Sequence, residues 1–176
     1  MKFVKVTDRF KDMDQLDKLN IEAFPEDERI PLPRMLEMCR SGRLEIMAFY
    51  DEEFVGFAAV SRKENTSYLF YLAVKKEFRS KGYGGKILKE LLMIYPGSQI
   101  VVDMEVLDSS AENAKQREDR RRFYLKNNFI ATGYLLTYHG ITFEVMCSGE
   151  KFDKEGFKNL IDGLRNPHFL PVMFKG

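Results

Sequence analysis

The sequence predicts an α/β fold in which helices flank a mixed β-sheet. The main observation is a strand, turn, helix and strand within residues 68–106, where two apolar runs enclose a segment with helical apolar spacing. Such a unit makes its two strands parallel, with a right-handed crossover. Two other pairs of apolar runs, in residues 44–61 and 129–147, are joined by short polar links that are typical of β-hairpins. Parallel and antiparallel neighbours together predict one mixed sheet.

The composition is that of a globular chain with one hydrophobic core. Of 176 residues, 44% are apolar and 31% are charged, which excludes wholesale disorder. A net charge of +1 gives no overall field that recruits nucleic acid or an anionic membrane. The two cysteines, Cys39 and Cys147, are typical of a reducing compartment and lack neighbours at metal-ligand spacing. With neither a signal peptide nor a run of about 20 apolar residues, we expect a cytoplasmic protein without a metal.

The N-terminal part is expected to form a strand and two helices. Residues 3–6 read as a short strand, and Asp12 with Gln15 resembles a capping box that begins a helix. That helix ends at residues 24–25, before a loop with several prolines. Pro33 suits the first turn of a second helix, and Gly42 lies just past its end.

The elements that follow complete the sheet. We expect them in this order: strands 44–50, 54–61 and 68–74, a helix that ends near residue 95, strand 100–106, a charged helix over about 113–126, and strands 129–138 and 141–147.

The glycine-bearing turn after residues 68–74 is the clearest functional signal. Residues 79–85 read Arg-Ser-Lys-Gly-Tyr-Gly-Gly and lead into the helix. Glycines let a backbone approach a ligand closely, and the first amides of a helix have no internal acceptor. The helix dipole and the side chains of Arg79, Lys81 and Lys86 add positive charge. This turn therefore predicts a binding site for a phosphate group.

Two common phosphate motifs do not fit this turn. A P-loop requires glycine where Ser80 stands and serine or threonine where Ile87 stands, and a dinucleotide fingerprint that starts at Gly82 also fails at Ile87. The pattern Arg79-x-x-Gly82-x-Gly84, preceded by residues 72–74, instead resembles the acetyl-CoA signature of the GNAT superfamily of N-acetyltransferases. The predicted order of elements over about residues 2–147 also matches the GNAT-like acyl-CoA N-acyltransferase fold.

The resemblance implies an enzyme that transfers an acetyl group from acetyl-CoA to a primary amine of a small molecule or peptide by direct attack. In that family, backbone groups of the strand bind the acetyl carbonyl and the pantetheine, and amides of the turn bind the pyrophosphate. A monomer or homodimer is expected, with no nucleic-acid or membrane partner. The positions implied for acetyl-CoA binding are Leu72, Ala73, Val74, Arg79, Ser80, Lys81, Gly82, Tyr83, Gly84 and Gly85.

A second resemblance lies in residues 121–129, where a helix ends in Tyr124 and Phe129 opens the next strand. The family usually has glycine where Asn128 stands, and asparagine tolerates the left-handed conformation found after a helix. In many members this tyrosine protonates the departing thiolate, and a phenol with a pKa of about 10 is protonated at neutral pH. The alternative is a core tyrosine whose hydroxyl is satisfied by the protein.

The general base is less constrained by the sequence. Some family members have a glutamate on the strand before the turn, but Tyr68 stands there. Asp103 and Glu105 share one face of the next parallel strand, near its end. Glu105 is our candidate base, directly or through water, and Asp103 and an ordinary surface role remain alternatives.

The charged run of residues 115–122 has two interpretations. The family often has asparagine and a small residue where Arg117 and Arg120 stand. The run is either a solvated helix face or a set of arginines that grip coenzyme phosphates or an acidic acceptor. A nucleic-acid patch is not expected, because Glu118 and Asp119 interrupt the run.

An acidic loop at residues 26–28 lies where the acceptor wall of the family often sits. Its side chains would favour a cationic amine, or they are simply solvated. The residues are Glu26, Asp27 and Glu28, of which Glu26 and Glu28 are our candidates for acceptor binding.

Residues 149–176 extend beyond the resemblance, which leaves a domain of residues 1–148. Apolar residues at roughly helical spacing predict a helix that stops at residues 166–167, followed by an apolar arm; they are Phe152, Phe157, Leu160, Ile161 and Leu164. The extension packs on the core of the same domain, or it covers the acceptor cleft or forms a dimer contact.

Two other functions of the protein remain open. One is a non-catalytic acyl-CoA-binding or regulatory module, and the other is an interaction protein that uses this tail.

Overall fold

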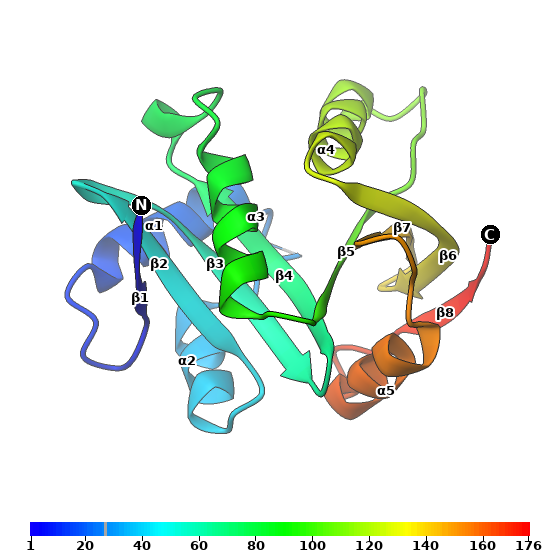
Figure 1. Cartoon of the computed structure of the whole chain (residues 1–176), viewed down its shortest axis with the longest axis horizontal. Helices are drawn as coiled ribbons and strands as arrows, with labels where there is room; N and C mark the ends of the chain where they lie inside the picture. Colours follow the sequence, from blue (N-terminus) through cyan, green and yellow to red (C-terminus); the bar gives the residue numbers. More distant parts are fainter. Residues whose placement is uncertain (27) are drawn as a thin grey trace. The chain divides into compact units, whose positions relative to one another are not determined.

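The structure is a computed structural model that describes residues 1–26 and 28–176 (Figure 1). Its strands form one sheet in the order β1-β2-β3-β4-β5-β7-β6-β8. The β4–β5 pair is parallel, whereas β1–β2, β2–β3, β5–β7, β6–β7 and β6–β8 are antiparallel. The predicted mixed sheet is therefore confirmed. The chain divides into two compact units, residues 1–61 with 69–94 and residues 62–68 with 95–176.

The first unit holds the N-terminal elements and the glycine turn. Its elements are β1 (Lys2–Lys5), α1 (Met13–Ala23), α2 (Leu32–Arg40), β2 (Glu45–Asp51), most of β3 (Glu53–Lys63) and of β4 (Thr66–Val74), the 3₁₀ turn η1 (Lys76–Phe78) and α3 (Tyr83–Ile94).

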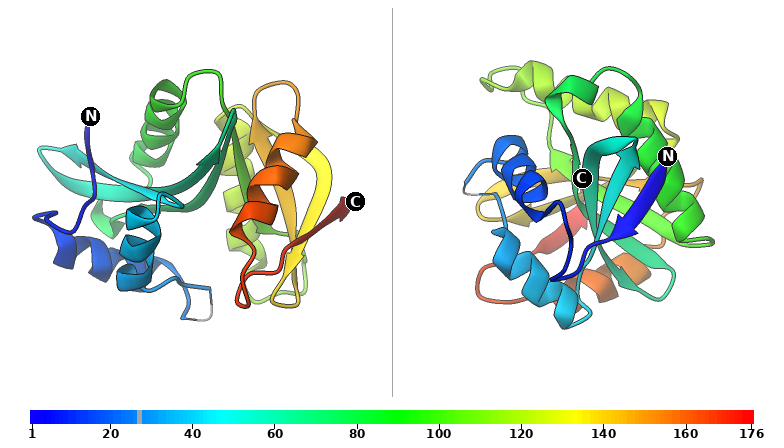
Figure 2. Two further views of the ribbon diagram at one scale, coloured as in Figure 1. Left: turned by 90° about the horizontal axis from the view of Figure 1, so that it is seen from below. Right: turned by 90° about the vertical axis from the view of Figure 1, so that its left-hand side faces the viewer.

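Helices cover both faces of the sheet in the first unit. Helix α3 lies on one face, and α1 and α2 lie on the other (Figure 2). The core between α1, α2 and the sheet buries apolar side chains that include Leu16, Leu19, Met35, Ile46 and Phe57. Gly42 has a φ of 71° directly after the end of α2, as expected for a glycine past a helix.

The start of α1 differs from the expected capping box. Asp12 occupies the N-cap position, but its side chain accepts no hydrogen bond from a helix amide. Instead it accepts hydrogen bonds from the side-chain amide of Gln15, at 3.0 Å, and from the hydroxyl of Tyr50 on β2. The expected reciprocal bonds were wrong because the partner hydroxyl comes from a strand that is distant in sequence.

The second unit holds the C-terminal elements and the start of β4. Its elements are β5 (Gln99–Glu105), α4 (Ala114–Lys126), β6 (Phe129–Tyr138), β7 (Ile141–Ser148), α5 (Lys154–Leu164) and β8 (Val172–Lys175). The parallel ladder between β4 and β5 includes the pairs Thr66–Gln99 and Tyr68–Val101, in agreement with the predicted crossover. No helix among residues 1–26 and 28–176 is long and apolar enough to cross a membrane.

The C-terminal extension forms the predicted helix and a strand that was not predicted. Helix α5 buries four residues of the helical pattern, from Phe157 to Leu164, whereas Phe152 lies before the helix begins at Lys154. The arm continues into β8, which pairs with β6 from Thr137–Val172 to Tyr134–Lys175. The sequence indicated only an apolar arm here, because so short a segment becomes a strand only through a partner distant in sequence.

Strands β3 and β4 approach each other closely at Gly56. A Cβ atom at this position would lie 2.1 Å from the carbonyl oxygen of Ala73 and 3.1 Å from the Cα of Val74. The amide of Lys75 also donates a hydrogen bond to the carbonyl of Val55, at 2.9 Å. Only glycine fits at position 56, and β3 therefore determines the path of the end of β4.

We expect Gly56→Ala to destabilise the protein by about 1–3 kcal/mol, because the added methyl group would clash with a backbone carbonyl that has little room to move. Denaturant unfolding measures this change. Gly163→Ala in α5 is the matched control, since a Cβ there meets no atom within 4 Å, and it should be neutral or stabilising by up to ~1 kcal/mol. Equal effects of the two substitutions would contradict the close approach.

Candidate functional site

The glycine turn has a backbone conformation that suits an anion. Ser80 and Gly82 have φ angles of 60° and 81°. Left-handed residues in such turns are typical of the backbone concavities that bind phosphate. A Cβ on Gly82 would meet no protein atom within 4 Å, so the space beside this backbone is open. Glycine is required there chiefly by its positive φ, and an open, glycine-lined turn fits a bound phosphate.

Helix α3 begins directly at this turn. Its first intrahelical hydrogen bond runs from the amide of Lys86 to the carbonyl of Gly82, at 3.1 Å. The amides of Tyr83, Gly84 and Gly85 precede that bond and have no acceptor in the helix. They lie at the positive end of the helix dipole, which favours a bound anion.

Two lysines at the turn have no carboxylate partner within the described part of the chain. The ammonium group of Lys86 lies 4.5 Å from the centre of the Tyr83 ring, and that of Lys81 lies 5.9 Å from the centre of the Phe78 ring. Their contacts with aromatic faces leave their charges uncompensated. Lys81 and Lys86 are therefore the cations of this turn that can meet a phosphate.

Other side chains of the turn hold it in place. The guanidinium of Arg79 donates to the carbonyl of Val74 at 2.9 Å, which fastens the turn to the end of β4. The Tyr83 hydroxyl donates to Asp51 at 2.7 Å, and this bond raises the pKa of Tyr83. The structure thus gives Arg79 and Tyr83, both expected in the coenzyme site, contacts that shape the turn.

The end of β4 was predicted to contact the acetyl group and pantetheine. Ala73 is buried there, and Leu72 and Val74 are half-buried. Gly56, which fixes the approach of this segment, was missed by the sequence analysis. The available signal was an isolated glycine within a strand pattern, which indicates a bulge or a close backbone approach.

Helix α4 buries Tyr124 among aromatic rings. The residue is 8% exposed, and its ring centre lies 5.2 Å from that of Phe123 and 5.3 Å from that of Phe129. Asn128, with a φ of 63°, ends the helix in the expected left-handed conformation. Burial raises the pKa of Tyr124 to about 12, while the nearby charge of Arg120 acts in the opposite direction.

The Tyr124 hydroxyl has no hydrogen-bond partner among residues 1–26 and 28–176. Within these residues, one fully buried side-chain nitrogen or oxygen atom lacks a hydrogen-bond partner, and it is Oδ1 of Asn20. The hydroxyl of Tyr124 therefore has donor and acceptor capacity that these residues do not use.

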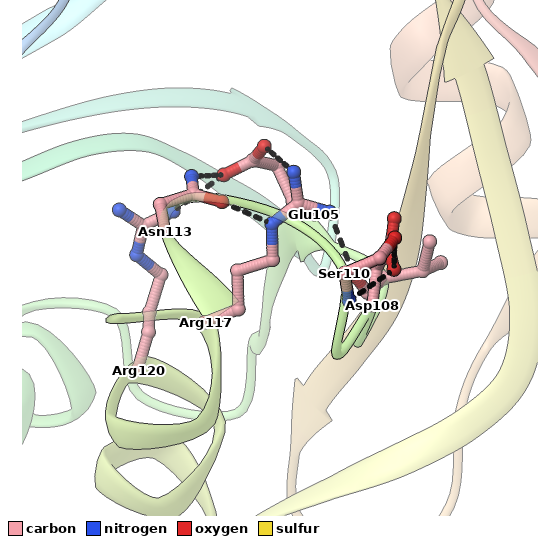
Figure 3. Close-up of polar contacts among 7 residues, drawn as sticks. Glu105, Asp108, Ser110, Asn113, Arg117 and Arg120 are labelled. Atoms are coloured by element: carbon pink, nitrogen blue, oxygen red, sulfur yellow. Dashed lines mark hydrogen bonds and ion pairs between the residues drawn. The ribbon is translucent and has the colours of Figure 1, made fainter. Parts of the chain in front are cut away.

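Glu105 is held in a network of polar side chains (Figure 3). Its Oε1 lies 2.6 Å from Nη2 of Arg117, and its Oε2 accepts a hydrogen bond from Asn113 at 3.0 Å. Arg117 also donates to Asn113 and to the carbonyl of Val106. The carboxylate would have to break this ion pair in order to accept a proton.

The remaining arginines of α4 differ in their pairing. Arg121 donates two hydrogen bonds to Glu144, and Arg122 pairs with Asp119. Arg120 is 47% exposed, and its one ion pair within the described residues is a 3.8 Å contact with Oε2 of Glu105. Arg120 is therefore the arginine of this run that has the most unused donor capacity.

Asp103 lies on β5 between two tyrosines. The hydroxyl of Tyr68 donates to its Oδ1 at 2.7 Å, and that of Tyr138 donates to its Oδ2 at 2.6 Å. Burial raises the pKa of Asp103, and the hydrogen bonds from Tyr138 and Tyr68 partly offset that increase. Tyr138 was missed because no sequence pattern shows that β6 comes close to β5.

The acidic loop lies between α1 and α2. Glu26 and Glu28 are exposed, and Asp27 lies outside the described residues. The carbonyl of Glu28 accepts a hydrogen bond from the Tyr71 hydroxyl at 2.8 Å, and the amide of Ile30 donates to the same hydroxyl at 3.0 Å. These bonds anchor the backbone of the loop to β4.

The mixed sheet and the glycine turn before α3 define an α/β protein with a candidate phosphate site at a helix N-terminus. A model of the acetyltransferase (GNAT) family matches residues 13–129, so the chain belongs to this family and the predicted family is confirmed. No curated protein matches the sequence.

Several solved structures share the fold. A GNAT-family protein from Bacteroides thetaiotaomicron is 20% identical with a TM-score of 0.72, and the match covers 96% of this chain and 98% of that one. An aminoglycoside 6'-N-acetyltransferase complexed with coenzyme A is 19% identical with a TM-score of 0.65, covering 87% and 100%. Naa50 from Arabidopsis thaliana, bound to the bisubstrate analogue CoA-Ac-MVNAL, is 19% identical with a TM-score of 0.56, covering 85% and 100%.

We expect Gly82→Val to abolish binding of coenzyme A, because a branched side chain disfavours the positive φ and would occupy the space beside the turn amides. Isothermal titration calorimetry with coenzyme A measures the loss. Gly97→Val is the matched control, since Gly97 has a φ of 75° and a similarly open surrounding but lies outside the turn. Intact binding by Gly82→Val would contradict the phosphate site.

Proposed function

We propose that the protein transfers an acetyl group from acetyl-CoA to a primary amine of a small molecule or peptide. The observation that carries this proposal is the start of α3, where a left-handed backbone and helix amides without helical acceptors coincide with two lysines that have no carboxylate partner in the described chain. Membership of the GNAT family supports it. The structural neighbours that include an aminoglycoside acetyltransferase and a complex with a peptide-bearing bisubstrate analogue support an amine acceptor.

In this proposal, the first unit binds the acetyl donor. The amides of residues 79–85 hold the diphosphate, and Lys81 and Lys86 add attraction at its edge. Backbone groups of Leu72 and Val74 hold the acetyl carbonyl and the pantetheine amides, and a strand N–H stabilises negative charge on the carbonyl oxygen. Acetyl-CoA supplies a thioester that an amine can attack directly.

Tyr124 is the proposed proton donor to the departing thiolate. Its hydroxyl is unpaired within the described residues, and its raised pKa keeps it protonated at neutral pH. On the acceptor side, Glu26 and Glu28 are proposed to favour a cationic amine, since both side chains are exposed on an anchored loop. A cytoplasmic location is proposed from the cysteine usage of the sequence.

Tyr124→Phe should slow turnover by at least about tenfold, because losing a general acid typically costs ~10²–10⁴ in rate. The affinity for acetyl-CoA should stay unchanged, since the ring and its packing remain. Steady-state kinetics and calorimetry separate the two effects. Tyr134→Phe on β6 is the control, because the Tyr134 ring packs on Phe152 outside the proposed site. Unchanged turnover of Tyr124→Phe would remove Tyr124 from the reaction.

The acetyl-transfer activity itself is tested with a panel of amines. Release of the coenzyme A thiol is followed with 1,4-diaminobutane, kanamycin and a short peptide with a free N-terminus as acceptors. We expect release above the rate of thioester hydrolysis with at least one amine, and loss of that release in Gly82→Val. Tight binding of acetyl-CoA without thiol release from any amine would instead support a non-catalytic acyl-CoA-binding module.

A further inference from the structure

Asp103 is a half-buried carboxylate whose protein partners are neutral. Tyr68 and Tyr138 each donate one hydrogen bond to it. In the part of the chain that the structure describes, no lysine, arginine or histidine forms an ion pair with Asp103, and Arg120 influences it only at longer range. Buried carboxylates are normally paired with a cation. A carboxylate offers about four acceptor positions, of which the tyrosines use two, so Asp103 can still receive a cationic donor.

The two carboxylates of β5 are therefore not equivalent. Glu105 contacts Arg117, Arg120 and Asn113, and its charge is compensated. Among the described residues, the hydrogen-bond donors to Asp103 are neutral groups, so its charge is not compensated by a cation. A partly buried carboxylate without a cation is a candidate for ligand binding or catalysis, whereas one locked in an ion pair with arginine is typical of structural support.

Two aromatic residues of the C-terminal extension pack against the two tyrosines that contact Asp103. The Tyr138 ring stacks on Phe143 with centres 4.4 Å apart, and Phe169 meets its edge at 5.1 Å. The Tyr68 ring packs against Phe157 of α5 at 5.4 Å. Phe157 and Phe169 lie beyond residues 13–129, the segment that matches the family model. The surroundings of Asp103 therefore depend on a part of the chain outside the family match.

We propose that Asp103 binds the ammonium group of the acceptor amine and takes its proton, and that the C-terminal extension positions Asp103 through Tyr68 and Tyr138. This inference rests on the proposed acetyl transfer and assigns its acceptor as an aliphatic ammonium ion. The carboxylate of Asp103 supplies the negative charge that attracts this ammonium ion.

The proton balance of this step is simple. One N–H bond of the ammonium ion breaks, its electron pair remains on nitrogen, and an O–H bond forms on Asp103. The neutral amine can then attack the thioester. The proton on Asp103 later leaves to solvent, which accounts for the net proton that acetylation of an ammonium ion releases.

The electrostatics around Asp103 support this role. Burial raises its pKa, which makes the carboxylate a better proton acceptor at neutral pH. The titratable and charged groups that face it are Tyr68 from β4, Tyr138 from β6, and Arg120 and Tyr124 from α4. The pKa of Tyr68 is raised well above its ordinary value by burial and by Asp103, so Tyr68 remains a hydrogen-bond donor.

The first test compares Asp103→Asn with Glu105→Gln, using the panel amine of highest activity. Asp103→Asn should lower kcat/KM for the amine by about 10²–10⁴, the usual contribution of a general base, while the Kd for acetyl-CoA and the unfolding midpoint change little. Glu105→Gln should reduce kcat/KM far less. A larger loss in Glu105→Gln than in Asp103→Asn overturns the proposal.

The second test is the pH dependence of kcat/KM, which a merely structural role would not alter. An acidic limb should report ionisation of Asp103, and an alkaline limb should fall at the pKa of the amine, because the ammonium form binds. Tyr138→Phe removes a hydrogen bond that lowers the pKa of Asp103, so the acidic limb should move to higher pH. A rate that rises until the amine is neutral, with no shift in Tyr138→Phe, overturns the proposal even if Asp103→Asn fails to fold.

The third test addresses the extension. Phe169→Ala should raise KM for the amine roughly 2- to 10-fold through loss of one aromatic contact, without changing the affinity for acetyl-CoA. Leu170→Ala is the control, because Leu170 is the exposed neighbour. Equal KM values in both variants overturn the role of the extension. Absence of thiol release from every panel amine with the unaltered protein overturns the proposed function and this inference together.

Discussion

The path of strand β4 is the constraint on which the other features depend. At its start, the strand pairs in parallel with β5, and the Tyr68 hydroxyl bonds to Asp103. At its end, the backbone of Ala73 leaves no room for a side chain at position 56 of β3. Arg79 then ties the glycine turn to the carbonyl of Val74. A shift of this strand would move the turn amides and release a hydrogen bond of the buried carboxylate.

The pairing of charges separates structural from functional groups. Arg117 and Arg121 have well-formed carboxylate partners, and such contacts fix α4 on the sheet. Within the described residues, Lys81 and Lys86 have no carboxylate partner. Asp103 likewise has no cationic partner among these residues. The exposed Lys81 and Lys86 are solvated and stay available to a phosphate, whereas Asp103 is partly withdrawn from water, so a cationic ligand would compensate its charge.

The sequence was sufficient for features that are local in the chain. The order of elements, the glycine turn and the left-handed Asn128 all follow from patterns within a few residues. The partners of Asp103 could not be predicted, because Tyr138 reaches it through the strand order β5-β7-β6, which no local pattern encodes. The same limitation hid strand β8. Gly56 was visible in the sequence, but its clash with Ala73 depends on how closely two strands approach.

The pKa of Tyr124 limits how the proposed proton donor can work. A phenol with a pKa of about 12 is a weaker acid than a thiol with a pKa of about 8.5, so complete transfer to a thiolate is uphill by ~1.4 kcal/mol for each unit of difference. Transfer is therefore favoured only if Tyr124 recovers a proton, which the attacking nitrogen can supply as it becomes an amide. Arg120, four residues earlier on α4, lowers the pKa of Tyr124 and reduces this difference. The incomplete pairing of Arg120 with Glu105 leaves its charge available for that role.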